Sequence, residues 1–349
     1  MGRRVLFLIR GKLGDSLIAY ATVRQYADSF PDDELTLLIR SKYARLLAGE
    51  KGVRILGFSN RLSLLAKLVR LALEPRFDAV LAIWAFGEPV RWVGRLARAR
   101  RKVYIDRRFA DLYPEYPDLP PEPLQSEPAW RVAQLFEPRL PQPGELRVAG
   151  LAAAKAARPV AIGIGPVSDE PRRTMGPEIL RLLAATLRER HPGAPVRIFL
   201  NAADEGAKPL LDAGAPPGTE FVFFPQLEDL VRELGQLAHL YTTDTGLHHV
   251  AAAMGVATTV FYGPTQAWRN AMPRQPDFRR IRLRSLGAQH CEVKDCARPV
   301  CLEHAVARYC ALDFDSRVET TPAACPLRPL PGDPLAAIEV HEGPDRQAR

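Results

Sequence analysis

Long apolar runs and glycine-rich nucleotide loops are both missing from this chain of 349 residues. No stretch of about 18 uncharged apolar residues occurs, so the sequence predicts no membrane-spanning helix. The first apolar run ends at Arg10 and is too short for a secretory signal, so we expect a soluble cytoplasmic protein. Neither G-x-x-x-x-G-K-[ST] nor G-x-G-x-x-G occurs, which argues against a P-loop enzyme and against a dinucleotide-dependent oxidoreductase.

The charge is unbalanced toward Lys and Arg, with a net charge of +8 and a pI of about 9.4. Residues 91–108 hold eight Lys or Arg and one acid. Three more basic residues lie on the polar side of an amphipathic helix expected at 61–73: Arg61, Lys67 and Arg70. Basic and aromatic residues are not interleaved as in nucleic-acid motifs, so we expect no nucleic-acid partner. The basic surface instead predicts an anionic substrate or peripheral contact with an anionic inner membrane.

Strand and helix patterns alternate along the chain, which predicts parallel, doubly wound α/β sheets. Apolar runs in the first half occupy residues 4–10, 34–40, 53–58, 77–84 and 101–106. A proline-rich stretch at 113–128 interrupts the pattern. It restarts at Pro159, with runs at 159–165, 195–201, 221–226, 239–244 and 258–263. Two Rossmann-like halves fit this pattern better than one large sheet, with a ligand in the cleft where the carboxyl ends of both sheets meet.

The loop after the first expected strand reads RGKLGDSL and carries Lys12 and Asp15. Its two glycines are three residues apart, which fits neither phosphate-binding fingerprint. Two interpretations of Asp15 remain. It is either an N-cap that binds free backbone N–H groups at a helix start, or a general base that faces the cleft.

A second motif begins where the strand expected at 239–244 ends. The next helix presents Thr245, Gly246 and free N–H groups in its first turn, and Asp244 and His249 flank that turn. Such a helix N-terminus binds anions. The alternative is an ordinary capped helix with a packed histidine.

Four segments resemble the heptosyltransferases of lipopolysaccharide core synthesis, which form glycosyltransferase family 9. They are IRGKLGD at 9–15, FDAVLAIW at 77–84, RRKVYID at 100–106 and DTGLHHVAAAMGVATTVFYGPT at 244–265. The resemblance covers nearly the whole chain. It implies the GT-B architecture, in which two Rossmann-like domains have parallel sheets that face a central cleft. It also implies inverting transfer of a heptose from an ADP-sugar to an acceptor hydroxyl, with no cofactor required for catalysis.

The resemblance also implies roles for individual residues. Asp15 becomes the base that deprotonates the acceptor, and the donor diphosphate rests on the helix N-terminus described above. The donor-binding residues are Asp244, Thr245, Gly246, His249, Arg173 and Glu205, where Arg173 is chosen over Arg172 and Glu205 is a candidate for the nucleotide ribose by position. We assign Lys12 and Arg61 to an anionic glycolipid acceptor. Gln266 stands where an Asp-Pro often follows Gly-Pro-Thr, so the donor sugar stays open.

All five cysteines lie within 35 residues near the C-terminus, although no C-x-x-C motif occurs. Free thiols in a reducing cytoplasm are one interpretation. The other is a structural zinc or iron ion, as in relatives that glycosylate autotransporter proteins. Its expected ligands are Cys291, Cys296, Cys301 and Cys310.

The sequence thus predicts an acceptor domain over residues 1–150 and a nucleotide-sugar domain over 151–330. The second includes a cysteine-rich segment at 288–326, and a tail follows at 331–349. The predicted function is sugar transfer, with heptose as the expected sugar, from an ADP-sugar to a lipopolysaccharide-core-type acceptor. Two alternatives stay open: transfer to a protein hydroxyl, and a non-catalytic protein of the same fold that binds a sugar nucleotide.

Overall fold

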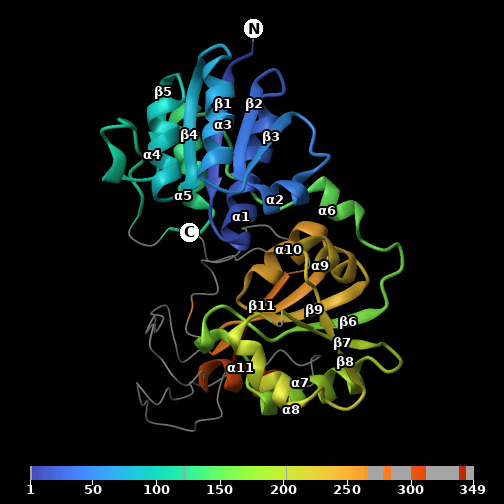
Figure 1. Ribbon diagram of the computed structural model, residues 1–349. Coiled ribbons are helices and arrows are strands. Elements are labelled where there is room, and N and C mark those ends of the chain that lie inside the picture. Colours follow the sequence, from blue (N-terminus) through green and yellow to red (C-terminus); the bar gives the residue numbers. More distant parts are fainter. Residues whose placement is uncertain are drawn as a thin grey trace. The chain divides into compact units, whose positions relative to one another are not determined.

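The computed structural model describes residues 2–120, 123–201, 203–263, 265, 278–283, 300–311 and 338–342 (Figure 1). The chain divides into two compact units, of which unit 1 takes Met1–Ala153 and unit 2 begins at Ala154. Each unit is built around its own mainly parallel sheet. The predicted α/β class with two Rossmann-like halves is therefore confirmed.

Unit 1 holds a five-stranded parallel sheet in the order β3-β2-β1-β4-β5. Its strands are β1 (Arg4–Arg10), β2 (Glu34–Arg40), β3 (Val53–Phe58), β4 (Phe77–Ala85) and β5 (Ala99–Tyr104). In β1 the five residues between the two terminal arginines are fully buried. A continuous apolar run of this kind is expected where helices cover both faces of a parallel sheet.

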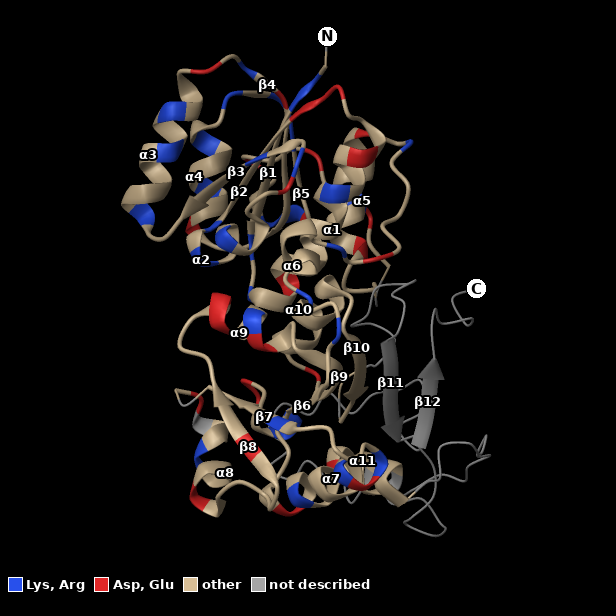
Figure 2. Cartoon of the chain, turned by 90° about the vertical axis from the view of Figure 1, so that its right-hand side faces the viewer, with Lys and Arg blue, Asp and Glu red and all other residues tan. Residues whose placement is uncertain are grey.

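Helices cover both faces of the sheet in unit 1 (Figure 2). On one side α1 packs against α5, and on the other α3 packs against α4. The helices are α1 (Leu13–Ser29), α2 (Ser41–Ala44), η1 (Arg45–Leu47), α3 (Arg61–Ala72), α4 (Glu88–Leu96), η2 (Arg107–Phe109), α5 (Glu127–Phe136) and α6 (Ala149–Ala153).

Unit 2 holds a seven-stranded sheet in the order β12-β11-β10-β9-β6-β7-β8. Its strands are β6 (Ala161–Gly165), β7 (Val196–Leu200), β8 (Thr219–Phe223), β9 (Leu237–Thr243), β10 (Ala257–Phe261), β11 (Phe278–Leu283) and β12 (Ile338–Glu342). All pair in parallel except β12, which runs antiparallel to β11. Neither β11 nor β12 was predicted from the sequence, and β12 lies within the segment at 331–349 that was expected to be a tail.

The helices of unit 2 connect these strands. They are η3 (Pro171–Arg173), α7 (Pro177–Arg190), η4 (Glu205–Ala207), α8 (Lys208–Ala213), α9 (Leu227–Leu234), α10 (Gly246–Met254) and α11 (Val300–Ala311). Among them α11 packs on α7, and both contribute to one apolar core that includes Leu183, Leu187 and Leu302.

In each unit the direction of winding reverses beside the first strand. In unit 1 the chain moves from β1 to β2 and β3, then returns to place β4 on the other side of β1. In unit 2 it moves from β6 to β7 and β8, then returns to place β9 beside β6. The connections that leave two such strands diverge to opposite faces, so a crevice opens at their carboxyl ends. Each unit therefore has one place, fixed by topology, where loops converge on a ligand site.

A network of ion pairs connects the residues that precede β1 and β2 with the residues that follow α5. Arg3 contacts Asp33 at 2.8 Å and Glu137 at 2.6 Å, and Nε of Arg139 lies 3.0 Å from Glu137. Glu137 is only 4% exposed. Hydrogen bonds from Arg139 and Arg3 hold the pKa of Glu137 down to about 2, against a desolvation penalty that acts the other way.

We expect Glu137→Gln to lower the free energy of unfolding by about 2 kcal/mol at neutral pH. Because the pKa of Glu137 falls from an ordinary 4.5 to about 2 in the folded chain, this contribution is complete above pH 4.5 and is lost as the pH falls toward 2. Chemical denaturation across that range should show the two proteins converging in acid. Glu34→Gln is the control, because the Glu34 side chain is 73% exposed. If the parent and Glu137→Gln differed in free energy of unfolding by the same amount at every pH, the lowered pKa of Glu137 would not be the cause.

Candidate functional site

Asp15 lies in the first turn of α1, just after the carboxyl end of β1. Its Oδ2 accepts a hydrogen bond from the backbone N–H of Lys12 at 3.3 Å, and its Oδ1 accepts one from Nε2 of Gln125 at 2.7 Å. Asp15 thus makes a capping contact, and it is also held by a side chain 110 residues away in sequence. A residue that only caps a helix does not require the contact with Gln125.

The Asp15 side chain is half-buried. Burial raises the pKa of its carboxyl group, and the hydrogen bonds from Lys12 and Gln125 partly offset that effect. The indole N–H of Trp84, at the end of β4, is buried and makes no hydrogen bond with the described residues. Gly11 allows this crowding, because a Cβ there would lie 2.7 Å from Cβ of Asp15 and 2.8 Å from the indole. A partly desolvated carboxylate with a raised pKa suits proton abstraction near neutral pH.

A cavity of about 690 Å³ opens in unit 1 where β1, β2 and β3 end. Its lining includes four cationic side chains and one acidic one: Arg10, Arg40, Lys42, Arg61 and Glu88. Arg61 pairs with Glu88 at 2.5 Å, and Arg10 donates to the carbonyl of Phe86 at 2.8 Å. Burial and the neighbouring Arg40 lower the pKa of Arg10, which is the signature of a cation short of counter-charge. The cavity therefore favours an anionic group.

Two acceptor residues were predicted, and only one of them lines this cavity. Arg61 starts α3 and contributes to the wall. Lys12 is exposed at the start of α1 and is not among the lining residues. No local pattern marked Arg10, Arg40 and Lys42 as site residues, because they become neighbours only when three strands end side by side.

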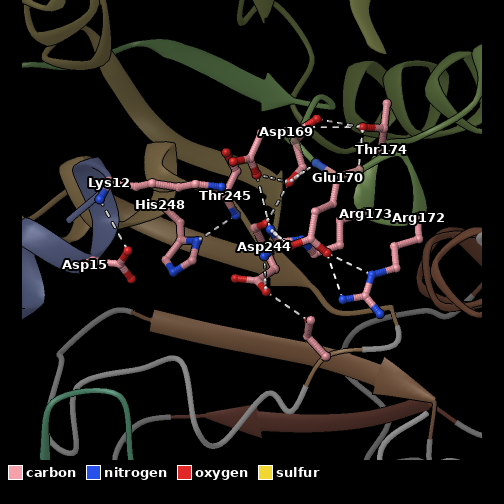
Figure 3. A network of polar contacts seen from close by, with 12 residues as sticks. Lys12, Asp15, Asp169, Glu170, Arg172, Arg173, Thr174, Asp244, Thr245 and His248 are labelled. Carbon is pink, nitrogen blue, oxygen red and sulfur yellow. Dashed lines mark hydrogen bonds and ion pairs between the residues drawn. The ribbon is translucent and has the colours of Figure 1, made fainter. Parts of the chain in front are cut away.

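In unit 2 the carboxylate of Asp244 joins three loops (Figure 3). Its Oδ2 lies 2.9 Å from Nη1 of Arg173 and accepts a hydrogen bond from Oγ1 of Thr265 at 2.9 Å. The hydroxyl of Ser168 donates to the Asp244 carbonyl at 3.3 Å. Asp244 and Arg173 follow β9 and β6, the two strands at the reversal of winding, and Thr265 follows β10.

Arg173 belongs to a loop that is ordered by its own acids. It contacts Asp169 at 3.2 Å and Glu170 at 3.0 Å, while the amide of Ser168 donates to Oγ1 of Thr174 at 3.1 Å. Arg172 contacts only Glu170 among these acids, at 2.8 Å (Figure 3). Arg173, the arginine predicted from the sequence in preference to Arg172, is the one that contacts Asp244.

The N-terminus of α10 follows Asp244 directly. Thr245 is its N-cap, and the Thr245 amide donates to Nδ1 of His248 at 3.3 Å. Gly246 begins the helix, and nearby Gly165 allows close packing, since a Cβ there would collide with Leu247 and Thr242. His249 is the histidine that was predicted to bind the donor, whereas the histidine in contact with Thr245 is His248.

His249 lies inside unit 2. It is 6% exposed, and its ring centroid lies 3.7 Å from that of His248. Burial and the neighbouring His248 hold the pKa of His249 well below its ordinary value, so the ring is neutral near pH 7. Any contact of His249 with an anion would therefore be a hydrogen bond without a charge.

The residue predicted for the ribose, Glu205, begins η4 after β7, and its side chain lies outside the described part of the chain. Its neighbour Asp204 is described. Burial and the charge of Asp169 raise the pKa of Asp204, whose Oδ1 accepts a hydrogen bond from Asn201 at 3.3 Å. The carboxyl end of β7 thus brings Asp204 toward the loop of Asp169, and the role of Glu205 stays a prediction.

Of the four predicted metal ligands, Cys291 and Cys296 lie outside the described residues. Cys301 and Cys310 are both in α11 and pack against the apolar core. The two cysteines are nine residues apart in the helix, so their Cα atoms are about 13 Å apart along its axis. This is too far for both thiolates to bind one ion. Burial raises the pKa of Cys310. The described residues include no cluster of three or more metal-binding side chains, and a metal site that includes Cys291 and Cys296 stays a prediction.

Comparison of the sequence with family models finds no match. Comparison with curated proteins also finds none.

Comparison of the structure with solved structures finds similar folds. A family 9 glycosyl transferase from Veillonella parvula is 16% identical over 79% of this chain and 84% of its own, with a TM-score of 0.65. The heptosyltransferase WaaC of E. coli with ADP is 19% identical over 77% and 90%, with a TM-score of 0.63. The ADP-heptose lipopolysaccharide heptosyltransferase II of E. coli is 18% identical over 90% and 100%, with a TM-score of 0.62.

These likenesses span both units of the chain. At such low sequence identity they establish the fold alone. This protein therefore has the fold of the family 9 glycosyltransferases and heptosyltransferases, as the sequence resemblance predicted.

Proposed function

We propose that this protein is an inverting glycosyltransferase that transfers a sugar, with heptose as the leading candidate, from an ADP-sugar to an acceptor hydroxyl. One observation carries the proposal: Asp244, Arg173 and Thr265 converge beside the N-terminus of α10, at the reversal of winding in unit 2. A crevice with a guanidinium and a helix N-terminus suits a nucleoside diphosphate. Solved structures of the same fold include one with ADP and one with ADP-2-deoxy-2-fluoro heptose.

In the proposed reaction the acceptor oxygen attacks the anomeric carbon, and the bond from that carbon to the diphosphate oxygen breaks with inversion. Asp15 takes the proton of the acceptor hydroxyl. The departing ADP gains negative charge, which Arg173 and the N–H groups at Thr245 and Gly246 stabilise more strongly than they stabilise the intact donor. In this scheme Asp244 orients the Arg173 guanidinium.

The basic cavity of unit 1 supports an anionic acceptor. Four cationic side chains line it beside a single acid, and phosphate or carboxylate groups of a glycolipid would complete their charge balance. We therefore propose a lipopolysaccharide-core-type glycolipid as the acceptor, with Arg61 among its contacts. Lys12, exposed beside Asp15, is proposed to contact the same acceptor outside the cavity.

A donor screen tests the proposal directly. Binding and slow hydrolysis would be measured for ADP-, GDP- and UDP-sugars, and we expect ADP-heptose to be preferred over the other donors. Binding without any hydrolysis or transfer would favour a non-catalytic protein that binds sugar nucleotides. No binding of any of these donors would overturn the proposed function.

We expect Asp15→Asn to lower kcat by at least about 100-fold while ADP-sugar affinity and thermal stability are kept, because the amide retains its size but cannot accept the proton. Turnover with acceptor and donor affinity by calorimetry would be measured on the same preparation. Asp28→Asn is the control, since Asp28 lies at the other end of α1 and is exposed. Near-native turnover by Asp15→Asn would leave only the capping role.

We also propose that Gln125 positions the base. Its Nε2 donates to Asp15, whereas its own Oε1 is buried with no hydrogen-bond partner in the described part of the chain. A buried oxygen without a hydrogen bond lowers the stability of the folded chain, so the Gln125 side chain is held beside Asp15 at a cost in folding free energy. The other groups that face the carboxylate are Lys12 and Trp84.

Gln125→Glu should move the acid limb of the kcat profile to higher pH, because it replaces a donor with a second carboxyl group and raises the pKa of Asp15 further. Activity well above that limb should recover toward the parent value. The pH dependence of kcat measures this shift. Gln134→Glu is the control, because half-buried Gln134 lies on α5 and accepts a hydrogen bond from Arg131. An unchanged acid limb in Gln125→Glu would show that the contact is only structural.

Gly246→Val should weaken ADP binding by about tenfold or more with little change in melting temperature, since a branched side chain would stand where a phosphate approaches the backbone. Calorimetric titration with ADP measures the loss. Glu228→Val places the same side chain in the first turn of α9 and should bind ADP as the parent does. If Gly246→Val also bound ADP normally, the diphosphate would have to bind elsewhere.

A further inference from the structure

Helix α3 of unit 1 has two apolar faces, of which one is buried and the other is exposed. Leu64, Leu68 and Leu71 are buried against the rest of the unit. On another face four large apolar side chains are exposed: Leu62 by 77%, Leu65 by 36%, Val69 by 54% and Leu73, the C-cap residue, by 86%. They account for four of the nine exposed large hydrophobic residues described in the chain.

The four exposed side chains form one stripe. Their spacing of three, four and four residues places them within an arc of about 80° on a helix of 3.6 residues per turn. The buried leucines lie on a separate arc. The sequence predicted an amphipathic helix here with a basic polar side. In the structure the side of α3 that faces solvent is instead apolar along its middle.

Basic residues border the stripe on both sides. Arg61 lies at one border, Arg70 lies at the other with Lys67 beyond it, and α3 contains no acidic residue. The neighbouring α4 adds exposed Arg91 and Arg95. The nearby acids are already engaged, Glu88 by Arg61 and Glu74 by Arg4 and Arg54.

We propose that α3 is a docking surface for an anionic lipid bilayer, with the stripe Leu62, Leu65, Val69 and Leu73 inserted at the interface and Lys67 and Arg70 on lipid head groups. A helix with an apolar stripe between cations lies in the plane of such a surface. The helices of the described residues include none that is long and apolar enough to cross a membrane.

A second copy of the chain suits this stripe poorly, because pairing two such surfaces would bring their basic borders together without acids to offset them. The inference deepens the proposed function and rests on it for its biological meaning, since Arg61 and Leu64 of the same helix line the basic cavity. Docking through α3 would bring that cavity to the surface where a glycolipid head group lies.

The test is co-sedimentation of the full chain with vesicles of phosphatidylcholine, with and without phosphatidylglycerol. We expect binding to the anionic vesicles only, and a loss of at least about tenfold in Leu62→Ser/Leu73→Ser, whose positions are exposed. Lys67→Gln/Arg70→Gln should lose about tenfold as well, by removing two charges. Val160→Ser and Phe223→Ser are the controls, because these exposed apolar residues of unit 2 lie outside α3.

Three results would overturn the inference: equal binding to neutral vesicles, unchanged binding by Leu62→Ser/Leu73→Ser, or self-association in light scattering that this double variant abolishes. The last would show that a second copy covers the stripe. ADP affinity is measured on the same samples and should be equal in all variants. If the parent failed to bind ADP, the proposed function would fail while the vesicle result stood.

Discussion

The reversal of winding beside β1 and β6 is the constraint on which the candidate sites depend. A parallel sheet buried on both faces cannot offer its faces to a ligand, so chemistry is confined to the carboxyl ends of the strands. There the connections on either side of the reversal diverge, and polar residues can meet without breaking the core. Asp15 with Trp84 in unit 1, and Asp244 with Arg173 in unit 2, both lie at that position.

The two aspartates are held in different ways, and their proposed roles follow from that difference. The donors that bind Asp15 are a backbone amide and the side-chain amide of Gln125, both neutral, and burial raises its pKa. Such a carboxylate can take up a proton. Asp244 instead lies against the guanidinium of Arg173 and the hydroxyl of Thr265. In the proposed scheme it orients the guanidinium of Arg173 toward the diphosphate.

Cationic side chains of unit 1 gather in two places. One group of cations lines the cavity at the ends of β1 to β3, and another borders the apolar stripe of α3. Arg61 belongs to both groups. An anionic glycolipid would present a charged head group and an apolar phase together, and this helix offers a complement to each. The net charge of +8 alone could not have separated these two uses.

The sequence by itself determined the α/β class, the strands of both sheets as far as β10, and the positions of Asp15 and Asp244 at strand ends. Continuous apolar runs and helix-start residues are local signals, so they can be recognised without the fold. Only the tertiary structure brought Gln125 to Asp15, Thr265 to Asp244, and Arg10 and Arg40 to one cavity. It also showed that the stripe of α3 is exposed and that Cys301 and Cys310 are too far apart for one ion. Each of these features depends on how segments far apart in the sequence pack against one another. A local sequence pattern carries no information about such distances.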